Sequence, residues 1–236
     1  MLNNSYNRVK QHLNSKRLIC FFFLILFSLF VPTMLPRENY NFFFNLIYNY
    51  QYYISSLFTI FLLIVNTTLY IKKNINFHYQ VHRYGTQKKI MLENIKDIIL
   101  ITIIMEIVCF LLNVSFSIIF VDGIQNITFK YSHLSITVYL IYFLVVRLIT
   151  MFTINMYVYI MHYKNTITSK IILIILLVSN VFIFSEKTPF LLSSYLYGAN
   201  FKSFTGEVLN FVLCVLMWWI VLFIITKNNI LKKRDI

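Results

Sequence analysis

The chain has 236 residues, of which 59% are hydrophobic and 12% are charged, with only four glycines and three prolines. Its apolar residues are gathered into runs close to membrane-spanning length, which excludes a soluble globular domain. The formal net charge of +13 does not indicate a nucleic-acid-binding protein, because the basic residues lie in the segments that separate the apolar runs.

Six apolar runs predict six transmembrane helices, at about residues 18–35, 52–71, 98–121, 134–161, 171–184 and 208–226. A transmembrane β-barrel would instead show short segments of alternating hydrophobicity. Since few glycines and prolines are left for irregular structure, long helices must carry most of the chain. The predicted fold is therefore an all-α polytopic bundle that forms a single transmembrane domain over residues 1–236.

The lysines and arginines predict the orientation. Sixteen of them lie in the two terminal segments and in the second and fourth loops: Arg8, Lys10, Lys16, Arg17, Lys72, Lys73, Arg83, Lys88, Lys89, Lys96, Lys164, Lys170, Lys227, Lys232, Lys233 and Arg234. The other loops hold four: Arg37, Lys130, Lys187 and Lys202. Because positive charge is retained on the cytoplasmic side, both termini and residues 74–96 are predicted to be cytoplasmic.

The first 17 residues are polar and basic. Leu2, Tyr6, Val9 and Leu13 recur at helical spacing, which favours an amphipathic helix in the membrane interface with Arg8 and Lys10 near lipid headgroups. A cytoplasmic tail without fixed structure is the alternative.

The outer stretch at residues 185–207 is apolar enough to be buried but too short to cross a bilayer. We expect a re-entrant or interfacial element there, broken near Gly198. An aromatic-rich loop lying on the headgroups is the alternative interpretation.

Two ionisable residues fall inside predicted spans, Glu106 in the third and Arg147 in the fourth. An ionisable group in hydrocarbon is costly, so it usually faces a partner or a wet cavity. Counted from the cytoplasmic ends, Glu106 lies roughly 12 Å deep and Arg147 roughly 15 to 20 Å deep, within reach of each other. The two are predicted to form an intramembrane polar pair, either as a packing contact or as part of a translocation path.

Several kinds of chemistry are not supported. The chain has no phosphate-binding P-loop, no HExxH zinc motif and no Gly-x-Ser-x-Gly elbow. His78 and His82 would share a helix face, but without a third ligand nearby a solvated surface is favoured over a metal site. Cys20, Cys109 and Cys214 all fall inside predicted spans and imply neither a disulfide framework nor a metal set.

The layout of the chain resembles a known family. The six spans, the cytoplasmic termini, the amphipathic start, the basic insertion between spans two and three, and the outer element between spans five and six are similar to those of the permease subunits of type 2 bacterial ABC exporters. In local sequence the resemblance rests mostly on Arg83 to Lys89, RYGTQKK, which resembles the R-Y/F-G-S/T-x-K/R segment of small bacterial permeases.

The resemblance implies that residues 74–96 form a coupling element seated in a separate ABC ATPase subunit, which would hold the ATP and Mg²⁺. The coupling residues would be Arg83, Tyr84, Gly85, Lys88 and Lys89, which comprise three basic residues, an aromatic anchor, and a glycine that permits a sharp turn. This chain itself would be no enzyme and would need no cofactor. Six spans would be half of a transport unit, which implies a second copy or a similar permease as partner, in a bacterial plasma membrane.

The cargo implied by the family is an amphipathic peptide, a lipid or a hydrophobic drug. A second hypothesis is a stand-alone immunity or toxin-binding membrane protein that does not transport. A third is an intramembrane enzyme built on Glu106, Arg147 and His162, which is the weakest because no two catalytic residue types lie at a spacing that assembles a site.

Overall fold

The computed structural model describes residues 2–13, 19–21, 23–26, 46, 53–74, 87–119, 135–164 and 203–230. Within these residues the regular structure is entirely helical, which confirms the predicted all-α class. The longest helices are α4 (Tyr53–Asn74), α6 (Gln87–Ile119), α7 (Ile136–Lys164) and α10 (Phe204–Ile230). The chain divides into two compact units, Met1–Gln125 and Asn126–Ile236.

Three of the described helices are long and apolar enough to cross a membrane, over Lys89–Ser115, Thr137–Ile160 and Phe204–Thr226. They coincide with the third, fourth and sixth predicted spans and indicate a membrane protein. In α4 the apolar stretch is shorter, Thr59–Lys72. The first and fifth predicted spans lie mostly or wholly outside the described residues, so the total of six spans remains a prediction.

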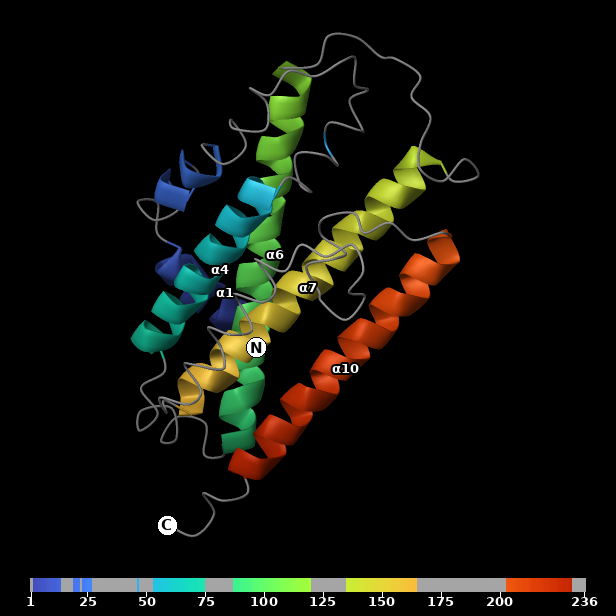
Figure 1. Cartoon of the computed structure of the whole chain (residues 1–236). Helices are drawn as coiled ribbons and strands as arrows, with labels where there is room; N and C mark the ends of the chain where they lie inside the picture. The colour runs from blue at the N-terminus through green and yellow to red at the C-terminus, as the bar shows by residue number, and fades with distance from the viewer. Residues whose placement is uncertain are drawn as a thin grey trace. The chain divides into compact units, whose positions relative to one another are not determined.

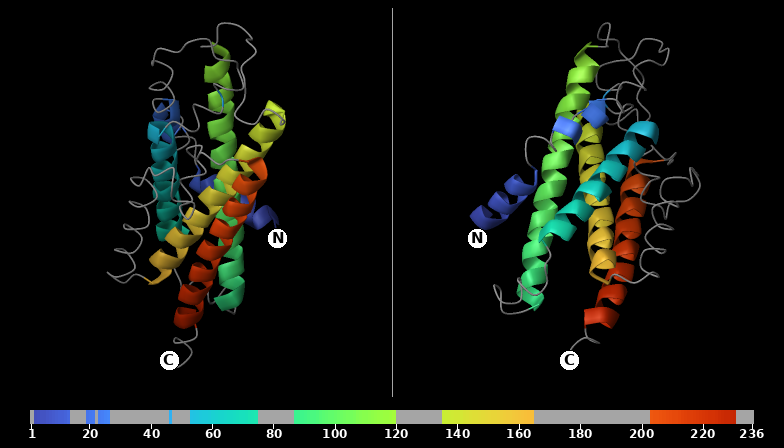
Figure 2. Two further views of the ribbon diagram at one scale, coloured as in Figure 1. Left: turned by 45° about the vertical axis from the view of Figure 1, so that its right-hand side comes forward. Right: turned by 90° about the vertical axis from the view of Figure 1, so that its left-hand side faces the viewer.

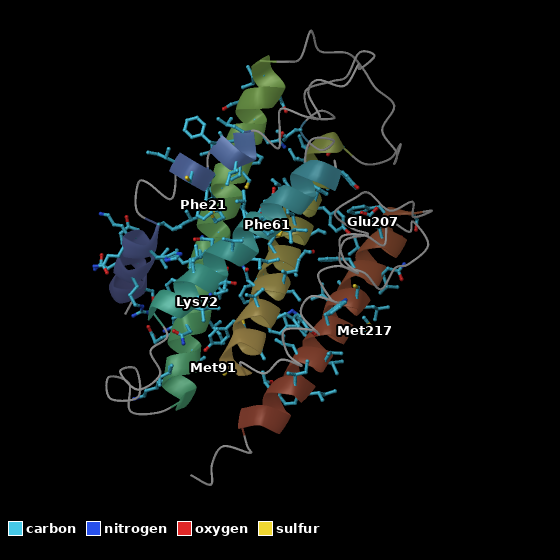
Figure 3. All side chains as sticks on the ribbon, turned by 60° about the vertical axis from the view of Figure 1, so that its left-hand side comes forward. Phe21, Phe61, Lys72, Met91, Glu207 and Met217 are labelled. Atoms are coloured by element: carbon cyan, nitrogen blue, oxygen red, sulfur yellow. The ribbon has the colours of Figure 1, made fainter. Side chains whose placement is uncertain are left out.

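The first unit is built from α1 (Leu2–His12), α4 and α6. Helix α1 packs on α6, and α4 packs on α6 (Figures 1 and 2). The end of α4 and the start of α6 lie at the same end of this unit, where Figure 3 labels Lys72 and Met91. Buried apolar side chains from α4 and α6 form its core, including Leu62, Leu63, Ile98, Ile101 and Met105.

The second unit contains α7 and α10, which run side by side (Figure 1). Tyr157 on α7 packs edge-on against Trp218 with ring centroids 5.5 Å apart, and its hydroxyl donates to the Trp218 carbonyl oxygen at 2.5 Å. The indole Nε1 of Trp219 donates to Thr153 Oγ1 at 3.1 Å. Aromatic side chains thus join the two helices by ring packing and by hydrogen bonds.

Helices α7 and α10 each begin with a serine cap. Ser135 Oγ accepts from the Val138 amide at 3.4 Å, and Ser203 Oγ accepts from the Gly206 amide at 3.2 Å. Each serine satisfies an amide of the first turn that has no partner within the helix. Helix α10 therefore begins at Phe204, so the last residues of the predicted outer element at 185–207 form its cap and first turn. Residues 185–202 of that element lie outside the described residues.

One face of α10 is buried and the other exposed. Phe211, Cys214, Trp218 and Leu222 are buried at a spacing of three or four residues, whereas Leu209, Leu213, Leu216 and Ile220 are among the exposed apolar side chains. This periodicity is that of one helix face packed on protein. The exposed apolar face suits contact with lipid chains.

Candidate functional site

The predicted coupling residues are only partly described. Arg83, Tyr84 and Gly85 lie outside the described residues, whereas Lys88 and Lys89 fall in the first turn of α6, where the Lys89 side chain is exposed. Residues 87–96 of the predicted coupling segment therefore belong to α6, which begins eleven residues before the predicted start of the third span at residue 98. The coupling role of these residues remains a prediction.

The 33 residues of α6 make it much longer than a membrane span requires. At 1.5 Å per residue the helix is roughly 50 Å long, against a hydrocarbon core of about 30 Å. Its charged residues are concentrated at the start, with Lys88, Lys89, Glu93, Lys96 and Asp97 in its first eleven positions. The charged end and the apolar part therefore form one continuous helix with no loop between them.

A partly buried ion pair joins this charged end of α6 to α1. Arg8 Nε donates to Asp97 Oδ2 at 2.7 Å, and Arg8 Nη2 donates to Asp97 Oδ1 at 2.8 Å. The Asp97 side chain is 0% exposed and that of Arg8 is 19% exposed. This two-point geometry is the strong arrangement for a guanidinium and a carboxylate, and it holds both groups in a fixed orientation.

Residues of α4 and α6 make further contacts with this pair. The Tyr70 hydroxyl on α4 donates to Asp97 Oδ2, so a single carboxylate joins α1, α4 and α6. Arg8 Nη2 also contacts Glu93 Oε2 at 3.2 Å, and Glu93 in turn binds Lys96 Nζ at 2.8 Å on the surface of α6. The buried negative charge is therefore neutralised and hydrogen-bonded, which is the condition under which such a charge is tolerated.

His12 gives α1 a second polar attachment, to α4. Its Nε2 lies 2.8 Å from Asn66 Oδ1 and 3.2 Å from the Asn66 carbonyl oxygen. Because a carbonyl oxygen only accepts, this ring nitrogen carries the proton. The imidazole also meets the Tyr70 ring edge-on, with centroids 5.2 Å apart. We call Arg8, His12, Asn66, Tyr70 and Asp97 the three-helix cluster.

The acidic side chains around Arg8 raise the pKa of its guanidinium. Burial by itself lowers the pKa of the guanidinium, but the hydrogen bond and the negative charge of Asp97 outweigh it, so the pKa is raised above its ordinary value. Arg8 stays positively charged at every physiological pH. Its guanidinium contacts Asp97 and Glu93 on α6, while the predicted position of α1 near lipid headgroups remains a prediction.

Sequence reasoning missed Asp97, Tyr70, His12 and Asn66. The available signal was the acidic pair Glu93 and Asp97, four residues apart in a segment otherwise rich in lysine and directly before an apolar run. On a helix that spacing places both carboxylates on one face, where they can attract an arginine from elsewhere in the chain. The identity of that arginine is not encoded in the spacing.

The predicted intramembrane residues are both buried. Glu106 on α6 is 8% exposed, and Arg147 on α7 is 1% exposed. They belong to different compact units, so a contact between Glu106 and Arg147 remains a prediction.

Within the described part of the chain, no three side chains of the types His, Cys, Asp and Glu gather as a metal site would require. His78 and His82 lie outside the described residues. The three cysteines are free thiols, with Cys20 exposed and Cys109 and Cys214 buried.

Comparison of the chain with protein-family models, with curated proteins and with solved structures gave no match.

Proposed function

We propose that this membrane protein is the permease subunit of an ATP-driven exporter that moves an amphipathic peptide, a lipid or a hydrophobic drug. A separate ATPase subunit would bind residues 74–96 and supply the energy, and a second copy or a similar permease would complete the transport unit. Both termini would face the cytoplasm at the plasma membrane.

The observation that supports this proposal is the continuity of α6. Lys88 and Lys89, at the end of the RYGTQKK segment, lie in the first turn of a helix that continues through the apolar stretch to Ile119. An ATPase that binds the start of α6 would act directly on a membrane-spanning helix. Asp97 is the α6 member of the three-helix cluster. Through its contacts with Tyr70 and Arg8, a movement of α6 would be transmitted to α4 and α1.

The proposal is tested by co-purification of the tagged protein from its native host in mild detergent. A triple variant, Arg83→Ala, Tyr84→Ala and Lys88→Ala, removes two cations and one aromatic ring from the predicted contact. The control triple variant, Tyr6→Ala, Lys10→Ala and Lys72→Ala, likewise removes two cations and one aromatic ring, from exposed positions of α1 and α4.

We expect an ATPase subunit to accompany the wild type and the control variant and to be lost from the first variant. Purified complexes should hydrolyse ATP at a rate that depends on the permease. Absence of an ATPase from intact wild-type protein would contradict the proposal, and a toxin peptide recovered in its place would support the immunity alternative.

A further inference from the structure

Helix α1 is a short polar helix that packs against α6, a helix long and apolar enough to span a membrane. An isolated helix of 11 residues is marginally stable in water, since helices shorter than about 12 to 15 residues rarely hold without tertiary contacts. The order of α1 therefore depends on what it docks to.

The inward face of α1 carries both apolar and polar side chains. Among the described residues at this end of the chain, Val9 and Leu13 are its buried apolar side chains, while Ser5 and His12 are buried and polar. The outward side chains Tyr6 and Lys10 are exposed. The ion pair of Arg8 with Asp97 and the contact of His12 with Asn66 add directional attachments to this apolar burial, and they fix the position of α1 on α6 and α4.

The anchor points of α1 lie on both helices that flank residues 75–86. Asn66 and Tyr70 lie in the last three turns of α4, and Asp97 lies in the third turn of α6. A movement that separates the end of α4 from the start of α6 would break the Tyr70 to Asp97 hydrogen bond, and it would also break the contacts of α1 to one of the two helices. Docking of α1 is thus coupled to close packing of the end of α4 against the start of α6.

We propose that α1 is a detachable strap, held by the Arg8 to Asp97 ion pair, that fixes the end of α4 against the start of α6 and releases when these ends separate. The strap is a conformational device of this chain and does not depend on the cargo or on an ATPase. In a transport cycle it would stabilise one state, and release of α1 would accompany the other.

The strap is tested by distances between spin labels in the full chain, reconstituted in lipid nanodiscs. One pair of labels, at Asn7 and Leu92, reports on α1 against α6, and a second pair, at Lys72 and Leu92, reports on α4 against α6. The three label sites, Asn7, Lys72 and Leu92, all have exposed side chains. The exposed Cys20 is first replaced by serine, while the buried Cys109 and Cys214 are retained.

Arg8→Gln is the test variant and Lys10→Gln is the matched control, because it removes the same charge from the exposed side of the same helix. We expect Lys10→Gln to keep the narrow distance distributions of the wild type. Arg8→Gln should lose the narrow distribution for both pairs. Asp97→Asn breaks the ion pair without leaving an unpaired buried carboxylate, and it should also lose the narrow distribution for both pairs. This variant replaces Arg8→Gln in the test if Arg8→Gln does not fold.

Three results would overturn the strap. An unchanged α1 to α6 distance in Arg8→Gln or Asp97→Asn would show that the ion pair does not hold α1. Release of α1 with an unchanged α4 to α6 distance would show that α1 does not fix the helix ends. Equal loss in Lys10→Gln would show a general effect of charge. Each result leaves the proposed transport function open to its own test by co-purification.

Discussion

Arg8 and Asp97 lie 89 residues apart in the chain, and the guanidinium of one meets both carboxylate oxygens of the other at 2.7 and 2.8 Å. The pair lies where a short N-terminal helix, the end of an apolar helix and the start of a spanning helix come together. A carboxylate with no solvent exposure in such a place contributes to stability only while its partner is present.

Removal of one member of this pair should destabilise the protein strongly. We expect Arg8→Gln to cost about 3 kcal/mol or more, because Asp97 is left as a buried charge that lacks its cation. The double variant with Asp97→Asn should recover part of that loss. Thermal unfolding in detergent, compared with Lys10→Gln as control, measures both. Equal costs for the single and the double variant would contradict the coupling.

Tyr70→Phe should cost about 1.5 to 3 kcal/mol, the usual range for a hydrogen bond to a charged group. The substitution removes the hydroxyl that donates to Asp97 and retains the ring that packs against His12. Tyr6→Phe, at an exposed position of α1, is the control and should change little. Thermal unfolding in detergent measures the loss of stability. A Tyr70→Phe variant that is as stable as the wild type would show that Arg8 alone satisfies the carboxylate of Asp97.

The Trp219 to Thr153 hydrogen bond should contribute a smaller amount. Trp219→Phe keeps an aromatic ring beside Phe152 and removes the donor, whereas Thr153→Val removes the acceptor. Hydrogen bonds between membrane helices average about 0.6 kcal/mol in double-mutant cycles, so we expect a coupling of that order. A coupling of zero would indicate that α7 and α10 are held by ring packing.

The exposed face of α10 should tolerate apolar but not charged residues. Leu216 lies near the middle of the helix and is 53% exposed. Leu216→Arg should disfavour membrane insertion by about 2.5 to 3.5 kcal/mol, whereas Leu216→Ala should insert normally. A glycosylation-based insertion assay measures the difference. Normal insertion of the arginine variant would contradict a lipid-facing position.

Arg147 and Glu106 provide a test of the predicted intramembrane pair. If they are partners, Arg147→Leu alone should destabilise the protein by about 3 to 5 kcal/mol, and addition of Glu106→Leu should restore part of the loss, since a lone buried charge is the costly state. Expression yield and thermal stability in detergent report the outcome. Equal damage from the single and the double variant would exclude the pair.

Hydropathy by itself determined the class of the protein. The chain is helical and membrane-bound because runs of apolar residues can satisfy their backbone groups in a bilayer only within helices, and that requirement acts on each segment independently. The third, fourth and sixth predicted spans coincide with α6, α7 and α10 for this reason. Helix boundaries were predicted less well, because capping by Ser135 and Ser203 and the early start of α6 depend on polar residues that a hydropathy count ignores.

The three-helix cluster was decided only by the tertiary structure. In sequence, Arg8 is one of sixteen cations on the predicted cytoplasmic side, and Asp97 is an acidic residue at the edge of an apolar run. Which cation meets which carboxylate depends on how α1 packs against α6 and on where Tyr70 is placed by α4. Local pattern fixes the face of a helix on which a side chain lies, but a contact across 89 residues follows from the packing of whole helices.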